Sequence, residues 1–129
     1  MRMEDCPGRT LAFLGDAAWS ETVRRHLIEN GYTTGSSLQK QSISYVSAKA
    51  QALFYDAMHE EGFLSEEEEE YFRRGRNSNA GSVPHGTPVS VYRRSTGFEA
   101  LIGYLDVSGK RDRIEEIWNQ AEAIRRENP

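Results

Sequence analysis

This sequence contains little of what marks membrane, secreted and disulfide-bonded proteins. No apolar run approaches the roughly 20 residues that a membrane-spanning helix needs. The charged start, Met1 to Pro7, contains no apolar segment of the kind found in signal peptides. Cys6 is the only cysteine, so no disulfide can form within the chain, which agrees with a reducing compartment. We therefore expect a cytoplasmic protein that acts without a membrane.

Motifs for three common chemistries are also missing. The chain has no Gly-x-x-x-x-Gly-Lys or Gly-x-Gly-x-x-Gly loop for nucleotide phosphates. It has no set of Cys and His residues at zinc-ligand spacing, and no Ser–His or Cys–His pattern that singles out covalent catalysis. With 129 residues, 37% hydrophobic and 28% charged, the chain is expected to form one domain over 1–129, with a polar leader over 1–9.

Hydrophobic periodicity predicts an all-α fold, because apolar residues recur three and four positions apart and no convincing strand-like alternation is found. A capping box, with Ser65 at the N-cap and Glu68 three residues later, marks one helix start. The side chains expected to be buried include Phe13, Ile28 and Leu53. Expected helical segments cover 10–29, 38–41, 44–61, 66–75, a short stretch from 89, a longer one from 95, and 110–126.

Charge is segregated along the chain, although the formal net charge is only −4. The windows 30–55 and 71–98 contain no acidic residue, and the second holds five arginines. Part of that window, 75–88, is rich in Gly, Pro, Asn and Ser, so we expect a mobile loop with basic edges there. A locally basic face can bind a polyanion even on an acidic protein, because distant charges are screened beyond about 8 Å.

Two carboxylates stand inside otherwise apolar helical segments. Asp16 lies within Leu11 to Trp19 beside Gly15, and Glu99 lies within Phe98 to Leu105 near Gly103. Helices that cross at these glycines would bring the two carboxylates within reach of one cation. Two carboxylates completed by waters suit Mg²⁺, which would support hydrolysis of a phosphodiester. The alternative is that each acid forms an ion pair with an arginine.

These two segments resemble the signature helices of a known family. Leu11-Ala-Phe-Leu-Gly-Asp-Ala resembles the first signature helix of the ribonuclease III catalytic domain, and Phe98-Glu-Ala-Leu-Ile-Gly resembles the second. Further blocks resemble the Mini-ribonuclease III branch, the bacterial branch without a double-stranded-RNA-binding domain. They are Val46-Ser-Ala-Lys-Ala-Gln51, Glu67-Glu-Glu-Glu, Arg73-Arg-Gly-Arg-Asn77 and Tyr92-Arg-Arg-Ser-Thr-Gly-Phe-Glu-Ala-Leu101.

The resemblance implies an all-helical endonuclease domain that forms a two-fold homodimer and hydrolyses double-stranded RNA. It assigns catalysis and metal binding to Asp16 and Glu99, with Mg²⁺ as the cofactor and Mn²⁺ able to substitute. It implies maturation of the ends of precursor 23S ribosomal RNA, and makes a ribosomal protein a candidate further partner. The candidate RNA-binding residues are Lys49, Arg73, Arg74, Arg76, Asn77, Arg94 and Thr96.

The chain also departs from the pattern of the full-length ribonuclease III enzymes. Those enzymes have a glutamate four residues before the aspartate and an aspartate three residues before the glutamate, where this chain has Ala12 and Thr96. A catalytically silent RNA-binding dimer is therefore an alternative function, and a helical interaction protein without RNA affinity is another. Leu14, Trp19 and Phe98 are expected either in the core or at a dimer interface.

Overall fold

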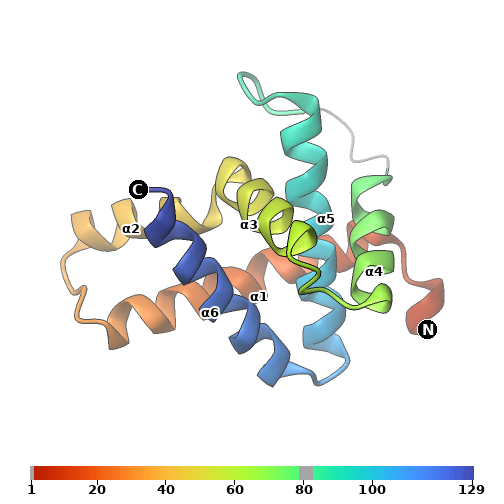
Figure 1. Ribbon diagram of the computed structural model, residues 1–129, viewed down its shortest axis with the longest axis horizontal. Helices are drawn as coiled ribbons and strands as arrows, with labels where there is room; N and C mark the ends of the chain where they lie inside the picture. Colours follow the sequence, from red (N-terminus) through yellow and green to blue (C-terminus); the bar gives the residue numbers. More distant parts are fainter. Residues whose placement is uncertain (1, 79–82) are drawn as a thin grey trace.

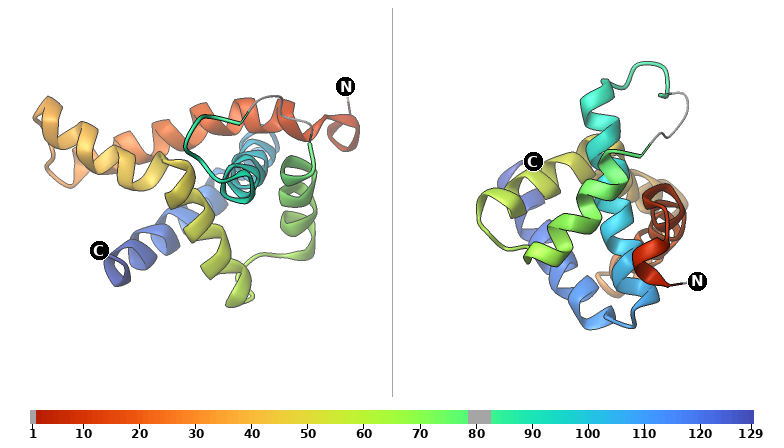
Figure 2. Two further views of the ribbon diagram at one scale, coloured as in Figure 1. Left: turned by 90° about the horizontal axis from the view of Figure 1, so that it is seen from above. Right: turned by 90° about the vertical axis from the view of Figure 1, so that its right-hand side faces the viewer.

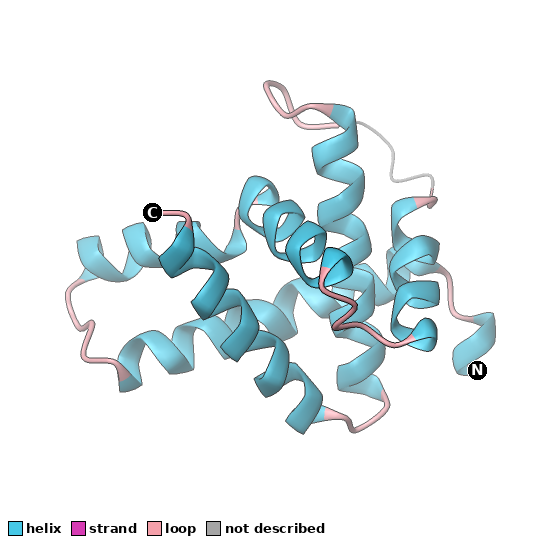
Figure 3. Ribbon diagram, viewed as in Figure 1, coloured by secondary structure: helices cyan, strands magenta, loops and turns pink. Residues whose placement is uncertain are grey.

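The computed structural model describes residues 2–78 and 83–129, and within these ranges it contains helices and no strand (Figure 3). The all-α prediction is therefore confirmed. The predicted loop over 75–88 falls partly on residues 79–82, which lie outside the described residues. The elements are a 3-10 turn η1 (Met3–Asp5), α1 (Gly8–Glu29), α2 (Gly35–Val46), α3 (Ala48–Glu60), α4 (Glu66–Arg76), α5 (Val89–Val107) and α6 (Arg111–Glu127).

Helices α1 and α5 cross at the centre of the molecule, and the other helices pack around them. In Figure 1, α1 runs across the molecule from red to orange while α5 passes over it at a steep angle. Viewed from above, in the left panel of Figure 2, α5 is seen nearly end-on with α1 on one side and α3, α4 and α6 around it. The crossing therefore fixes where residues of α1 and α5 meet.

Two glycines allow this crossing to be unusually close. A Cβ atom added at Gly15 would lie 1.7 Å from the backbone oxygen of Glu99, and one added at Gly103 would lie 1.9 Å from the backbone oxygen of Leu11. No side chain fits at either place, so only glycine permits the observed backbone contact. The predicted glycine-mediated crossing of the two acid-bearing helices is thereby confirmed.

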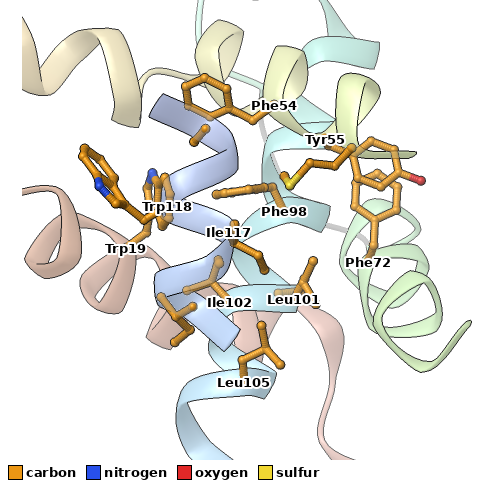
Figure 4. Packing of buried hydrophobic residues seen from close by; sticks show 14 of the residues in the cluster. Trp19, Phe54, Tyr55, Phe72, Phe98, Leu101, Ile102, Leu105, Ile117 and Trp118 are labelled. Carbon is orange, nitrogen blue, oxygen red and sulfur yellow. The ribbon is translucent and has the colours of Figure 1, made fainter. Parts of the chain in front are cut away.

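The core lies between this crossing and helix α6. Trp19 of α1 packs edge-on against Phe98 of α5, with ring centroids 5.0 Å apart, and lies 6.1 Å from Trp118 of α6. All three rings are fully buried (Figure 4). The indole nitrogen of Trp19 donates to the backbone oxygen of Tyr45 at 2.9 Å, which satisfies its one polar atom. Trp19 and Phe98 are thus core residues rather than interface residues.

At two of the places where helix boundaries differ from the prediction, a hydroxyl side chain is involved. Ser47 interrupts the expected helix over 44–61, because its backbone is extended and its side chain caps α3 by accepting from the Ala50 amide at 3.2 Å. Conversely, Ser95 does not start a new helix. Its hydroxyl and that of Thr96 donate back to the Tyr92 carbonyl, so α5 is continuous from Val89.

Three apolar side chains predicted to be buried are exposed. Phe13 is 83% exposed, Ile28 is 61% exposed and Leu53 is 37% exposed. The prediction was wrong because the close crossing narrows the buried face of α1, and because nothing in the described chain covers the outer side of these helices. Helical periodicity identifies an apolar stripe but does not say how much of it a neighbour covers.

No helix within residues 2–78 and 83–129 combines the length and the apolar character needed to cross a membrane.

Candidate active site

Asp16 and Glu99 meet at the edge of the α1–α5 crossing. Both line one surface depression of about 230 Å³. Their positions follow from the backbone, because the Glu99 carbonyl presses against Gly15, the residue before Asp16. The Asp16 side chain is exposed, whereas Glu99 is partly buried. The structure thus brings together the two acids that the sequence pointed out.

The pair is held without a basic partner. Among the described residues, neither Asp16 nor Glu99 forms an ion pair with Lys, Arg or His. The alternative interpretation, in which arginines neutralise these acids, is therefore wrong. Burial raises the pKa of Glu99 to about 8, and the neighbouring Asp16 carboxylate adds to the rise as a hydrogen-bond partner and a like charge. At neutral pH the pair consequently holds a proton that a bound cation could replace.

One neutral side chain contacts the buried acid. Gln51 of α3 is 2% exposed, and its amide nitrogen donates to Glu99 Oε2 at 3.4 Å and to the Val46 carbonyl at 3.3 Å. This bond favours the ionised form and opposes part of the rise in the pKa of Glu99. The sequence reasoning quoted Gln51 only as part of a family block.

Ala12 and Thr96 line the same depression as the two carboxylates. At the positions where full-length enzymes carry further acids, this site presents a methyl group and a hydroxyl. The Thr96 hydroxyl already donates to the Tyr92 carbonyl at 3.1 Å. Both departures from the family pattern therefore fall inside the site itself.

Two rim residues were missed by the sequence reasoning, Arg9 and Tyr92. Arg9 is exposed in the first turn of α1 and forms no ion pair with any described acid. Arg9 lies seven residues, or two helical turns, before Asp16, which puts both side chains on one face of α1. This spacing could have indicated that Arg9 belongs to the site. Arg9 had instead been assigned to the polar leader.

The C-terminal end of α4 brings four predicted RNA-binding residues close to α5. Gly75 packs against the Thr96 carbonyl, so the last turn of α4 lies beside the site. Arg73 and Arg74 both pair with Glu70, at 2.9 and 3.5 Å. The Arg76 Nε donates to the Asn77 side-chain oxygen at 3.1 Å, and the guanidinium lies over the Phe72 ring. Arg76 is thus the guanidinium of this group that has no acidic partner among the described residues.

Lys49 and Arg94 line a second depression, of about 410 Å³, between α2, α3 and α5. Lys49 is exposed in the first turn of α3 and forms no ion pair with any described acid. Arg94 is held by an ion pair with Asp56 and by the Ser90 carbonyl at 3.2 Å. The two basic side chains line one depression, but only the charge of Arg94 is paired with a described acid.

The donor set fits a hydrated divalent cation better than a fully protein-ligated one. No group of three or more His, Cys, Asp or Glu side chains that could hold a metal occurs in the described ranges. Two adjacent carboxylates without a basic partner among the described residues suit Mg²⁺, because it keeps several of its waters and binds one or two carboxylates. Asp16 and Glu99 are the residues that would hold it.

Comparisons with known proteins agree with this geometry. A family model described as the Ribonuclease III domain matches residues 9–110, which include both carboxylates. A protein of Streptococcus pneumoniae named Mini-ribonuclease 3 is 46% identical over 110 residues, which make up 85% of this chain and 86% of that protein. One of Brevibacillus brevis with the same name is 49% identical over 114 residues, 88% of this chain and 84% of that protein. A crystal structure of a Fusobacterium nucleatum protein matches with a TM-score of 0.81 at 34% identity, covering 91% of this chain and 93% of that one.

Proposed function

Since this chain belongs to the ribonuclease III family and is an endoribonuclease, we propose that Asp16 and Glu99 are its catalytic residues and that they bind Mg²⁺. The observation that carries the proposal is the pair itself: two carboxylates from two helices, adjacent and without a basic partner in the described ranges. A structural acid is normally neutralised where it is buried, whereas an unneutralised pair requires a cation or a proton.

Asp16 and Glu99 have different roles in the proposed reaction. Bound Mg²⁺ would supply a Lewis acid for the scissile phosphate and a water molecule of lowered pKa. Asp16 is exposed and presents its oxygens to the solvent side, while Glu99 must release its proton before it can serve as a ligand. At subsaturating Mg²⁺, cleavage should therefore increase with pH as Glu99 loses this proton. The products would be RNA ends with a 5′-phosphate and a 3′-hydroxyl.

Double-stranded RNA is the substrate class that the basic surface fits. Arg9, Arg76 and Lys49 carry positive charge without an acidic partner among the described residues. They come from three helices, α1, α4 and α3, rather than from one. A-form RNA is recognised mainly through phosphates and 2′-hydroxyls, which separated cations can contact. The other candidate contacts are Arg73, Arg74, Asn77, Arg94 and Thr96.

A two-fold homodimer forms part of the proposal, and Phe13 supports it. Phe13 lies on the rim of the carboxylate depression and is 83% exposed, although it is a large apolar side chain. An aromatic ring left this open on a site-forming helix is typical of an interface. Light scattering should report a dimer for the unchanged chain and a monomer for Phe13→Asp. A monomeric unchanged chain at micromolar concentration would exclude the dimer.

The cellular substrate and location follow from the resemblance to the Mini-ribonuclease III branch alone. We propose precursor 23S ribosomal RNA, processed in the cytoplasm, as the substrate. Assistance by a ribosomal protein stays a prediction. Incubation with precursor transcripts, followed by mapping of the new ends, tests the assignment: cuts scattered through the duplex rather than placed at the two mature ends would contradict it.

The decisive experiment uses Asp16→Asn and a labelled RNA duplex, with and without Mg²⁺. We expect the variant to lose cleavage by at least about a thousandfold while keeping its fold and its affinity for the duplex. Asp112→Asn is the matched control, because Asp112 is an exposed acid in the first turn of α6, away from the site. Full activity of Asp16→Asn would refute the proposed site. Binding without cleavage by the unchanged chain would instead favour the silent RNA-binding alternative.

A further inference from the structure

Helix α3 places one buried amide against the carboxylate pair. Its other buried side chains are apolar or aromatic, among them Ala50, Phe54 and Met58, whereas Gln51 is a polar residue that is only 2% exposed. An apolar residue of similar volume would fill this space without burying a polar group, and a buried polar group is unfavourable unless it is hydrogen-bonded. The amide at this position therefore needs a reason beyond packing.

Both contacts of the Gln51 nitrogen are to acceptors. It lies 3.3 Å from the Val46 carbonyl and 3.4 Å from Glu99 Oε2. A backbone carbonyl cannot donate, so the nitrogen rather than the oxygen of the amide must face Val46, and the same nitrogen then reaches Glu99. Its two hydrogens are then used on two different partners, which fixes the orientation of the side chain.

The charge of the donor matters as much as its position. A lysine or arginine in place of Gln51 would neutralise Glu99 and compete with a cation for it. A neutral amide can hold one carboxylate oxygen in place while leaving the negative charge available. Groups of this kind, which hydrogen-bond to a metal ligand and fix its orientation, commonly change metal affinity about 10- to 100-fold when they are removed.

We propose that Gln51 is a positioning residue that holds Glu99 in the orientation required for binding the divalent cation; this inference rests on the proposed function. Val46 is the last residue of α2 and Ser47 caps α3, so the amide is anchored at the junction between these helices. The junction therefore sets the position of a carboxylate that belongs to α5.

The test measures metal affinity directly, without RNA, on the full chain. Gln51→Met removes the donor while keeping an unbranched side chain of similar length, and Mn²⁺ binding is followed by the electron paramagnetic resonance signal of the free ion. We expect the Kd for Mn²⁺ to rise about tenfold, and the Mg²⁺ concentration for half-maximal cleavage to rise equally. The rate at saturating Mg²⁺ should recover, and duplex affinity measured in EDTA should not change.

Gln41→Met is the control, because Gln41 also uses its amide in a partly buried contact, accepting from Arg125 Nη2 at 2.6 Å, but lies on α2 and does not touch Glu99. It should leave the Kd for Mn²⁺ unchanged. Gln51→Asn serves as a second variant, since it keeps the amide but withdraws it by one methylene, and it should also weaken Mn²⁺ binding.

A Kd for Mn²⁺ within twofold of the unchanged chain, in whichever of the two Gln51 variants is folded, would overturn the role of Gln51. Equal weakening in Gln41→Met would also overturn it, because that result would indicate general loosening of the fold. If the unchanged chain neither binds Mn²⁺ nor cleaves RNA, the proposed function fails as well. The two failures are therefore distinguishable.

Discussion

Raising the pH of the metal-free protein from 5 to 8.5 should lower its free energy of unfolding, and Glu99 should account for much of the loss. Burial, reinforced by Asp16, raises the pKa of Glu99 from 4.5 to about 8 in the folded chain. Between these two values the folded state binds more protons than the unfolded state, so stability falls as pH rises. The contribution of protonated Glu99 is complete below pH 4.5 and is lost as the pH passes about 8.

The difference between the two pKa values of Glu99 sets an upper bound on this loss in the free energy of unfolding. Each pKa unit corresponds to about 1.4 kcal/mol, so the rise from 4.5 to about 8 sets a maximum near 5 kcal/mol. Glu99 lines an open depression and is not fully enclosed, so water and side-chain rotation relieve part of the penalty. We expect about 2 kcal/mol to be observed, a large share of the stability of a small domain.

Urea unfolding in EDTA, at pH 5 and at pH 8.5, measures this effect when the unchanged chain is compared with Glu99→Gln. The variant keeps the shape of the side chain but has no proton to lose. Titrating groups away from the carboxylate pair contribute equally to both proteins, so the difference between the pH dependences of the two proteins isolates the pair. Mg²⁺ should stabilise the unchanged chain more at pH 8.5 than at pH 5. At a hundred times its Kd the stabilisation is about 2.7 kcal/mol.

A parallel pH dependence in the two proteins would refute this reasoning, because it would mean that Glu99 ionises normally in the folded chain. Mg²⁺ stabilisation of similar size at both pH values would also contradict it, since binding would then release no proton from the site.

Three further predictions concern single substitutions at a helix crossing, at the rim of the site and at a buried ion pair. Gly15→Ala should destabilise the fold by about 3 kcal/mol and slow cleavage about a hundredfold, because the new Cβ, 1.7 Å from the Glu99 carbonyl, must push α1 and α5 apart. Arg9→Glu should weaken duplex RNA binding about fivefold at low salt and reduce the salt dependence by about one phosphate contact. Arg113→Met should lower the free energy of unfolding, measured by urea denaturation, by about 3 kcal/mol. Arg113 donates two hydrogen bonds to the carboxylate of Glu68, a residue that is 6% exposed and would be left buried without its partner.

Each of these changes has a control elsewhere in the chain. Gly35→Ala should be tolerated, since a Cβ there meets nothing within 4 Å. Arg24→Glu reverses an exposed charge toward the opposite end of α1 and should leave RNA binding nearly unchanged. Arg126→Met removes an exposed partner of Glu122 and should shift stability by less than about 1 kcal/mol. A control that behaves like its test variant would show that the contact in question is not responsible.

Local pattern predicted much of this molecule because helices are local structures. Periodic apolar residues indicated most of the helices, and Ser65 with Glu68 located the start of α4, where the capping box is present. Two acids beside glycines indicated a close crossing that the backbone contacts at Gly15 and Gly103 confirm. These inferences succeeded because spacing along a helix maps directly onto position around it.

Other features escaped prediction because they depend on what a neighbouring element covers. Phe13 and Leu53 have the spacing of core residues, yet no described segment lies over them. Arg9 belongs to the rim of the site only because α1 begins at Gly8, two residues earlier than predicted. The continuity of α5 was also missed, since hydroxyl groups that often cap helices donate back to the Tyr92 carbonyl here.

Periodicity predicted most of the helices and singled out the two unusual acids, and the resemblance to ribonuclease III indicated the class of chemistry. The folded chain adds two facts: Asp16 and Glu99 have no basic partner among the described residues, and Gln51 reaches Glu99 from a third helix. The physical reason is that ionisation and ligand orientation depend on burial and on groups brought together from distant parts of the chain. Glu99 is 48 residues from Gln51 along the chain, and no helical periodicity extends over that separation.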